Sequence, residues 1–151
     1  MMTTNEKNLA TFTHLSQLTQ YFIPFGNYIF PIIIWSSKKN ESEFVDANGK
    51  NVLNFQLSMF LYTMITLVIA VPVFIYSIFK NVSFNDFRSG RDFVIDSFSA
   101  GNITGIVILA LVVVLLFGFL KVIEFILIIY GSVKSSSGEV YKYPMTINFI
   151  K

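Results

Sequence analysis

Hydrophobic residues gather in three long stretches that carry almost no charge. Residues 53–79 contain no charged side chain, and about 27 residues of helix extend about 40 Å, enough to cross a hydrocarbon core of about 30 Å. Residues 106–120 are dominated by Val, Leu, Ile and Phe. The pattern predicts an all-α integral membrane protein with three long transmembrane segments, at about 9–37, 49–80 and 102–133.

The first of these segments is interrupted. Its first half is amphipathic, and Pro24 and Gly26 then break the helical pattern before Pro31 follows. One interpretation is a single crossing kinked at Pro24–Gly26. The other is a pair of half-helices that meet at this point and turn back as a re-entrant or tight hairpin. We favour the kinked crossing.

The remaining residues are expected to connect or follow the segments of a single transmembrane domain, 1–151. Asn48 and Gly49 predict a break before the second segment. Residues 81–101 mix acidic, basic and aromatic side chains, which is typical of a polar loop lying on the membrane surface. Residues 134–151 predict a short, extended juxtamembrane tail, since Pro144 is incompatible with a helix interior.

Composition supports a membrane setting. Apolar residues make up 54% of the chain and charged residues 13%, with 17 phenylalanines, and the mean hydropathy is +0.63. A soluble domain carries about a quarter charged residues, so lipid is the expected solvent. The net charge of +2 is too small to indicate nucleic-acid binding. Cysteine is absent, which excludes thiol chemistry and cysteine-based metal sites.

The distribution of lysine and arginine orients the chain. With three crossings, one side holds six basic residues and the other holds four. We therefore expect a multi-pass protein of the bacterial cytoplasmic (inner) membrane with a cytoplasmic C-terminus. The first side carries Lys38, Lys39, Lys50, Lys134, Lys142 and Lys151, and the second carries Lys7, Lys80, Arg88 and Arg91.

Three stretches of the sequence form a recognisable pattern: His14–Ser16 with Tyr21–Asn27 and Pro31–Trp35, then Val45–Lys50 with Asn54–Ser58, and finally Gly138–Pro144. Together they resemble a widespread bacterial family of small membrane proteins of unknown function. That family is distantly similar to the twenty-kilodalton membrane component of the chloroplast inner-envelope protein translocon. The resemblance covers nearly the whole chain in the right order and implies several transmembrane helices without an established chemistry.

Several polar side chains fall inside the apolar segments, where lipid cannot satisfy them. We expect these residues to form one polar cluster between the helices, or between this chain and a partner. Such a cluster would make single substitutions of its charged members more damaging than their joint replacement. The candidates are His14, Gln17, Asn54, Gln56, Lys121 and Glu124.

Each of these features has a structural and a functional interpretation. Lys121 and Glu124, three residues apart on one helical face, form either a structural ion pair or part of an ion or proton relay. We favour the structural pair. The single histidine, His14, is expected to bond between helices rather than titrate. Tyr141, Tyr143 and Pro144 are candidate contacts for a partner, although a tail resting on the membrane surface is the preferred interpretation.

No nucleophile motif, glycine-rich phosphate loop or cluster of metal ligands occurs in the sequence, so we expect neither an enzyme nor a cofactor. The first functional hypothesis is an accessory or scaffold subunit of a larger inner-membrane assembly, linked to protein export. The alternative is a small homo-oligomeric channel or transporter with a polar intramembrane site. Both hypotheses place the chain in a lipid bilayer with membrane-protein partners or copies of itself.

Overall fold

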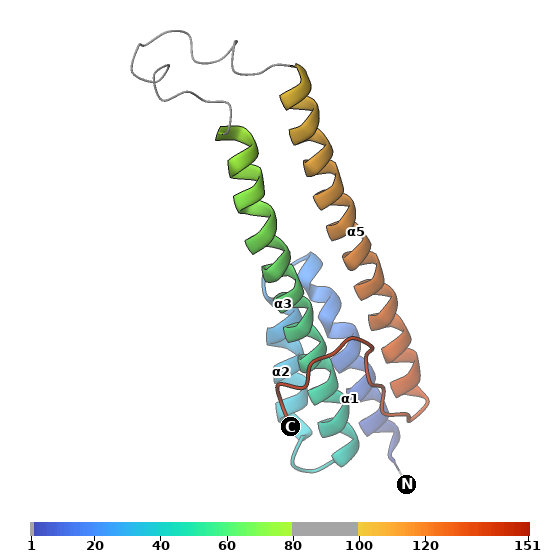
Figure 1. The fold of residues 1–151 in the computed structure, drawn as a ribbon. Helices are drawn as coiled ribbons and strands as arrows, with labels where there is room; N and C mark the ends of the chain where they lie inside the picture. The colour runs from blue at the N-terminus through green and yellow to red at the C-terminus, as the bar shows by residue number, and fades with distance from the viewer. Residues whose placement is uncertain (1, 80–99) are drawn as a thin grey trace. The chain divides into compact units, whose positions relative to one another are not determined.

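The computed structural model describes residues 2–79 and 100–151 and contains only helices, turns and irregular chain in these ranges. The predicted surface loop at 81–101 lies outside them, apart from its last two residues. Figure 1 shows the elements in chain order, and the all-α prediction is confirmed for the described residues. They are α1 (Thr4–Leu15), the 3₁₀ helix η1 (Ser16–Tyr21), α2 (Gly26–Lys38), α3 (Glu43–Phe79) and α5 (Ala100–Ser136).

The first segment is a helical hairpin, so the preferred prediction of one kinked crossing is wrong. α1 and η1 run in one direction, the chain turns at residues 22–25, and α2 returns alongside both (Figure 1). Phe25 adopts a left-handed conformation (φ 61°) at this turn. Gly26 permits the close approach of α2 to η1, because a Cβ there would lie 2.6 Å from Oγ1 of Thr19.

The predicted break at Asn48 and Gly49 is also wrong, since both residues lie inside α3. The helix begins earlier, and Ser42 caps its start. The Val45 N–H donates to Oγ of Ser42 at 3.4 Å, and the Asp46 N–H donates to the Ser42 carbonyl at 3.0 Å. Gly49 then allows the Trp35 side chain to pack on the helix backbone. A Cβ at position 49 would lie 2.1 Å from Cδ1 of Trp35.

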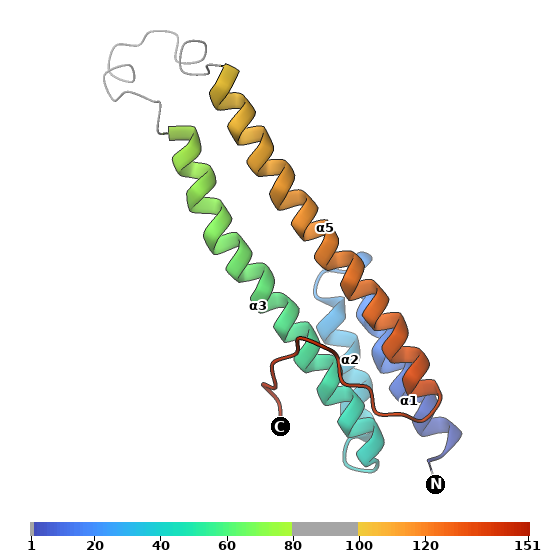
Figure 2. The ribbon, with the colours of Figure 1, turned by 45° about the vertical axis from the view of Figure 1, so that its right-hand side comes forward.

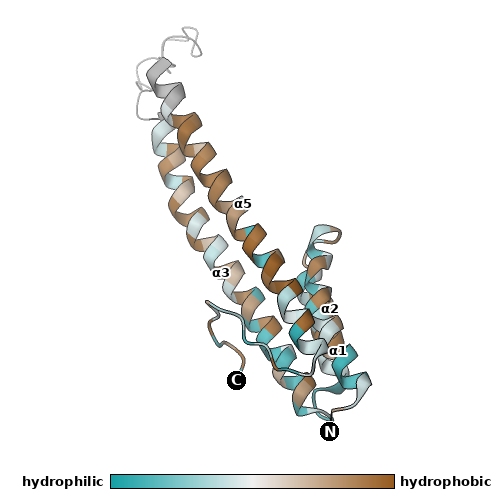
Figure 3. Ribbon diagram, turned by 90° about the vertical axis from the view of Figure 1, so that its right-hand side faces the viewer, coloured by the Kyte–Doolittle hydropathy of each residue, from teal (hydrophilic) through white to brown (hydrophobic). Residues whose placement is uncertain are grey.

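Two helices, not the three that we predicted, are long and apolar enough to cross a membrane in the described part of the chain. The candidate spans are Glu43–Ser77 and Gly105–Ser136. Figure 3 shows α5 as predominantly hydrophobic, whereas the first turns of α3 are mixed. The hairpin accounts for the missing span, because neither of its helices exceeds 13 residues and about 20 are needed to cross.

The chain divides into two compact units, one of residues 1–62 with 121–151 and one of residues 63–120. In the first unit, hydrogen-bonded side chains join the hairpin, the start of α3 and the end of α5. In the second unit, none of the residues 63–77 and 105–120 is buried. The two units therefore differ in burial: the first has a core of buried side chains, and the described residues of the second have none.

The C-terminal residues 139–151 form neither helix nor strand and lie across the first half of α3 (Figures 1 and 2). The Asn54 side chain binds this segment both as donor and as acceptor. Its amide nitrogen donates to the Ile150 carbonyl, and its oxygen accepts from the Phe149 and Ile150 N–H groups. Ser58 accepts from the Ile147 N–H at 2.8 Å, and the Tyr62 hydroxyl donates to the Met145 carbonyl at 2.7 Å. The segment is thus bound to the helix through its backbone.

Two glycines of the long helices are expected to respond in opposite ways to alanine. Gly49→Ala places a methyl group against the Trp35 ring and should destabilise the fold by about 1–2 kcal/mol, because overpacking outweighs the better helix propensity of alanine. At Gly118 an added methyl group would have no atom within 4 Å apart from its chain neighbours and its own helix backbone, so Gly118→Ala should be neutral or stabilising by up to about 1 kcal/mol. Unfolding in detergent measures both, and equal effects would contradict the Trp35–Gly49 contact.

Candidate functional site

Unit 1 contains a core rich in buried polar side chains. These side chains come from every element of the unit and are at most 8% exposed. Lipid cannot hydrogen-bond such groups, so each must find its partner inside the protein. The set comprises Thr13, His14, Gln17, Asn27, Ser42, Asn48, Asn54, Gln56, Ser58, Glu124, Ser132 and Ser135.

At one end of this core, Asn48 joins α1, α3 and α5. Its amide nitrogen donates to the Phe44 carbonyl at 3.0 Å, and its oxygen accepts the Ser135 hydroxyl at 2.9 Å. Nε2 of His14 lies 3.0 Å from the same oxygen. Because this oxygen can only accept, Nε2 must carry the imidazole proton, which leaves Nδ1 as an acceptor in the neutral ring.

Tyr143 of the C-terminal segment occupies the next position in the network. Its hydroxyl lies 2.6 Å from Nδ1 of His14 and, by the tautomer deduced above, donates to it. The same hydroxyl accepts from Nε2 of Gln17 at 2.8 Å. The Tyr143 ring stacks on Phe55 with centroids 4.1 Å apart. A single side chain therefore ties the C-terminal segment to α1, η1 and α3.

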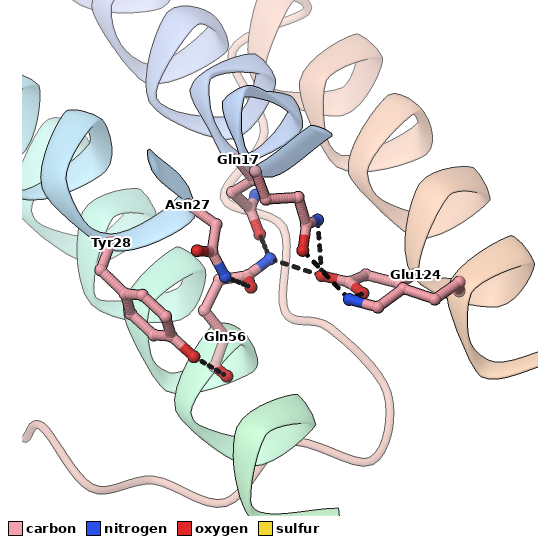
Figure 4. A network of polar contacts seen from close by, with 7 residues as sticks. Gln17, Asn27, Tyr28, Gln56 and Glu124 are labelled. Atoms are coloured by element: carbon pink, nitrogen blue, oxygen red, sulfur yellow. Dashed lines mark hydrogen bonds and ion pairs between the residues drawn. The ribbon is translucent and has the colours of Figure 1, made fainter. Parts of the chain in front are cut away.

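Gln17 and Gln56 carry the network towards α5, as Figure 4 shows. Nε2 of Gln56 donates to Oε1 of Gln17 at 2.7 Å and to Oε1 of Glu124 at 3.1 Å. Oε1 of Gln56 accepts from the Asn27 amide at 2.6 Å, and the Tyr28 hydroxyl donates to the Gln56 carbonyl at 3.2 Å. Gln56 thus connects α3, on which it lies, to η1, α2 and α5.

The network ends on an ion pair whose two members differ in exposure. The Glu124 side chain is completely buried, whereas the Lys121 side chain is 33% exposed. Lys121 Nζ lies 2.7 Å from Oε2 of Glu124 and 3.0 Å from Oε1 of Gln20, and Nε2 of Gln20 donates to Oε1 of Glu124 at 2.9 Å. With Gln56, the carboxylate receives hydrogen bonds from three residues, which offsets the loss of water around a buried charge.

Burial also controls the protonation of the two ring side chains at the other end. It lowers the pKa of His14, which lies outside both candidate spans, to about 4, an effect that the hydrogen bond donated to Asn48 only partly opposes. It raises the pKa of Tyr143 well above its ordinary value. Both side chains are therefore neutral at pH 7, in agreement with a phenol that donates to an imidazole.

Five of the six predicted cluster residues lie in this network: His14, Gln17, Gln56, Lys121 and Glu124. Asn54 does not, because its amide is engaged with the backbone of the C-terminal segment. Of the predicted partner contacts, Tyr143 is only 5% exposed within its own chain. Tyr141 is half-buried and donates its N–H towards Asn48 at 3.4 Å, while Pro144 is exposed.

Sequence reasoning missed Asn48, Gln20, Asn27 and Ser135. Asn48 was interpreted as part of a turn because an Asn–Gly pair is a common turn signal. The others are polar residues within or next to apolar stretches, and the argument from unsatisfied groups in lipid that selected Gln17 applies to them equally. In the residues that the structure describes, no group of three or more His, Asp or Glu side chains is placed to hold a metal ion.

A protein-family model described as the magnetosome magnetite crystal formation protein family matches residues 5–150. No curated protein and no solved structure matches the chain. The predicted resemblance to a bacterial membrane protein family is thus supported in its general form. The distant similarity to the chloroplast translocon and the link to protein export find no support in these comparisons. Together with the two candidate spans, the match indicates a membrane protein.

The ion pair should be most sensitive to loss of its lysine. Lys121→Met leaves the fully buried Glu124 carboxylate with neutral donors only, and we expect it to cost about 3 kcal/mol or more. Glu124→Gln should cost less, because Lys121 reaches solvent and retains Gln20. The double variant should recover most of the loss. Unfolding of the three variants in mixed micelles gives the coupling energy, and a double variant as unstable as Lys121→Met would contradict the pairing.

Proposed function

Because the chain belongs to the magnetosome magnetite crystal formation protein family, we propose that it is a non-enzymatic accessory subunit of a larger assembly in a bacterial membrane. In this proposal the chain contributes a rigid membrane-embedded unit and presents helical surfaces to other membrane components. The family description favours an assembly concerned with crystal formation over one that exports protein.

The observation that carries the proposal is the contrast between the two units. The polar side chains of unit 1 bond to one another, and among the described residues only one buried side-chain polar atom lacks a partner. In unit 2 most of the described side chains are apolar and none is buried: Val68 is 72% exposed, Leu115 70% and Val114 66%. Large contiguous apolar surfaces of this kind bind lipid or protein.

The same contrast disfavours the alternative of a homo-oligomeric channel. A water-filled pore needs polar groups that face its lumen. His14, Gln17, Gln56 and Glu124 are buried and hydrogen-bonded within one chain, which leaves them unavailable to line a pore between copies. A scaffold, in contrast, requires a stable interior and free outer faces.

Cross-linking from the uncovered helices tests the proposal. The sequence contains no cysteine, so Val68→Cys and Leu115→Cys each carry one photoactivatable thiol reagent without background. In native membranes we expect both positions to capture the same distinct membrane protein in stoichiometric amount. The exposed Ser37→Cys at the end of α2 is the matched control and should capture it weakly. A ladder of self-cross-links would instead support the homo-oligomer, and labelling of lipid alone would contradict the proposal.

We also propose that the C-terminus faces the cytoplasm. The hairpin returns the N-terminal region to the end of unit 1 that holds the C-terminal segment, since the Lys7 side chain lies against Gly138. Lys7 therefore joins the six basic residues on the side of Lys151, which leaves three basic residues between the two spans. Seven against three is a stronger positive-charge bias than the predicted six against four.

Reporter fusions test this orientation. A cytoplasm-active reporter should work after Asn40 and after Lys151, and a periplasm-active reporter should work only when inserted between residues 80 and 99. Both spans must cross for this pattern to appear. Opposite results at Asn40 and Lys151 would mean that only one of the two candidate spans crosses the membrane.

A further inference from the structure

A pocket of about 430 Å³ lies in unit 1 between the first turns of α3 and the C-terminal segment. Hydrogen bonds from α3 side chains hold the C-terminal segment along the edge of the pocket. The Asn51 amide donates to the Tyr141 carbonyl at 2.9 Å, and Asn54 binds the backbone at Phe149 and Ile150. The pocket is therefore part of the fold.

The lining of this pocket carries an excess of positive charge. Lys50, Lys142 and Lys151 all line it. Lys50 is paired with Asp46 at 2.6 Å, whereas Lys142 and Lys151 are exposed and form no ion pair within the described residues. Two lysines are thus available to an anion that enters the pocket.

A second observation points to the same place. Thr146 also lines the pocket, and its Oγ1 is buried and has no hydrogen-bond partner. It is the exception in a protein whose other buried side-chain polar atoms are satisfied among the described residues. A buried unsatisfied hydroxyl is costly, and a ligand oxygen in the pocket would supply its partner.

We propose that this pocket binds a phosphate group, with Lys142 and Lys151 supplying charge and the Thr146 hydroxyl donating to a phosphate oxygen. Phosphate suits the site because it offers several acceptor oxygens to lysine and hydroxyl donors at once. The phosphate can come from the headgroup of an anionic phospholipid or from free inorganic phosphate. The lysine-rich end of the chain, which would face an anionic membrane surface, favours the headgroup. This proposal does not depend on the accessory role proposed above.

Ligand-induced stabilisation of the full chain tests it. The purified protein in mild detergent is unfolded by heat in the presence of short-chain phosphatidylglycerol, short-chain phosphatidylcholine or inorganic phosphate. For the wild type we expect a saturable rise in Tm with phosphatidylglycerol or with phosphate, and little with phosphatidylcholine. Lys142→Gln with Lys151→Gln should raise the half-maximal ligand concentration at least about tenfold, as expected for lost charged hydrogen bonds.

Two further variants separate binding from folding and from general charge. Thr146→Val removes the hydroxyl at nearly constant shape, so it should weaken binding several-fold while leaving the Tm without ligand unchanged or higher. Lys38→Gln with Lys39→Gln removes an equal number of positive charges outside the pocket, and this double variant should bind the ligand as the wild type does. This threonine variant remains informative even if the lysine variant fails to fold.

The comparison of phosphatidylglycerol with inorganic phosphate distinguishes the source of the phosphate. Stabilisation by phosphatidylglycerol alone identifies a lipid headgroup, whereas the same variant-dependent stabilisation by inorganic phosphate identifies the free anion, and both results support the site. Absence of a saturable effect of either ligand on the wild type would overturn the proposal. Equal losses in the pocket pair and the control pair would overturn it as well, because they would indicate attraction to net charge alone.

Discussion

A single buried carboxylate imposes the main constraint on unit 1. Glu124 is completely buried, and a charge in that position is tolerated only when donors surround it. They come from three elements: Gln20 of η1, Gln56 of α3 and Lys121 of α5. Because η1 must reach α5, the N-terminal hairpin has to lie against the two long helices. The turn at Phe25 and the close approach at Gly26 then let α2 return alongside η1.

The direction of the hydrogen bonds makes the arrangement specific. The chain of bonds runs from Asn48 through His14, Tyr143, Gln17 and Gln56 to Glu124, and each member has a defined donor and acceptor role. A shift of one helix by a residue would turn its side chains by about 100° and separate these donors from their acceptors. In a bilayer, helices gain little from burying apolar surface against one another, and each interhelical hydrogen bond contributes only about 0.5–2 kcal/mol. The network therefore contributes more to the choice of one packing than to total stability.

The sequence allowed the helical class, the membrane setting and most of the cluster to be predicted, because these follow from the cost of polar groups in lipid. It did not separate a kinked crossing from a hairpin, since Pro24 and Gly26 are compatible with both. The decisive facts are the left-handed backbone of Phe25 and the contact between Thr19 and Gly26, which are tertiary. Asn48 was misassigned for a related reason: an Asn–Gly pair favours a turn locally, but Trp35 packs on Gly49 and Asn48 bonds to three elements.

The two units also illustrate two ways in which a small membrane chain uses its side chains. In unit 1, the buried polar side chains other than Thr146 are satisfied internally, and the C-terminal segment completes the network through Tyr143 while Asn54 and Ser58 hold its backbone. In unit 2, most of the described side chains are apolar and none is buried, so these side chains leave apolar surface for the surroundings to cover. The interactions of unit 1 are thus largely internal to the chain, whereas the apolar side chains of unit 2 are left to contact other molecules. That division fits a subunit that brings a stable interior to an assembly and leaves its apolar helices for other membrane components.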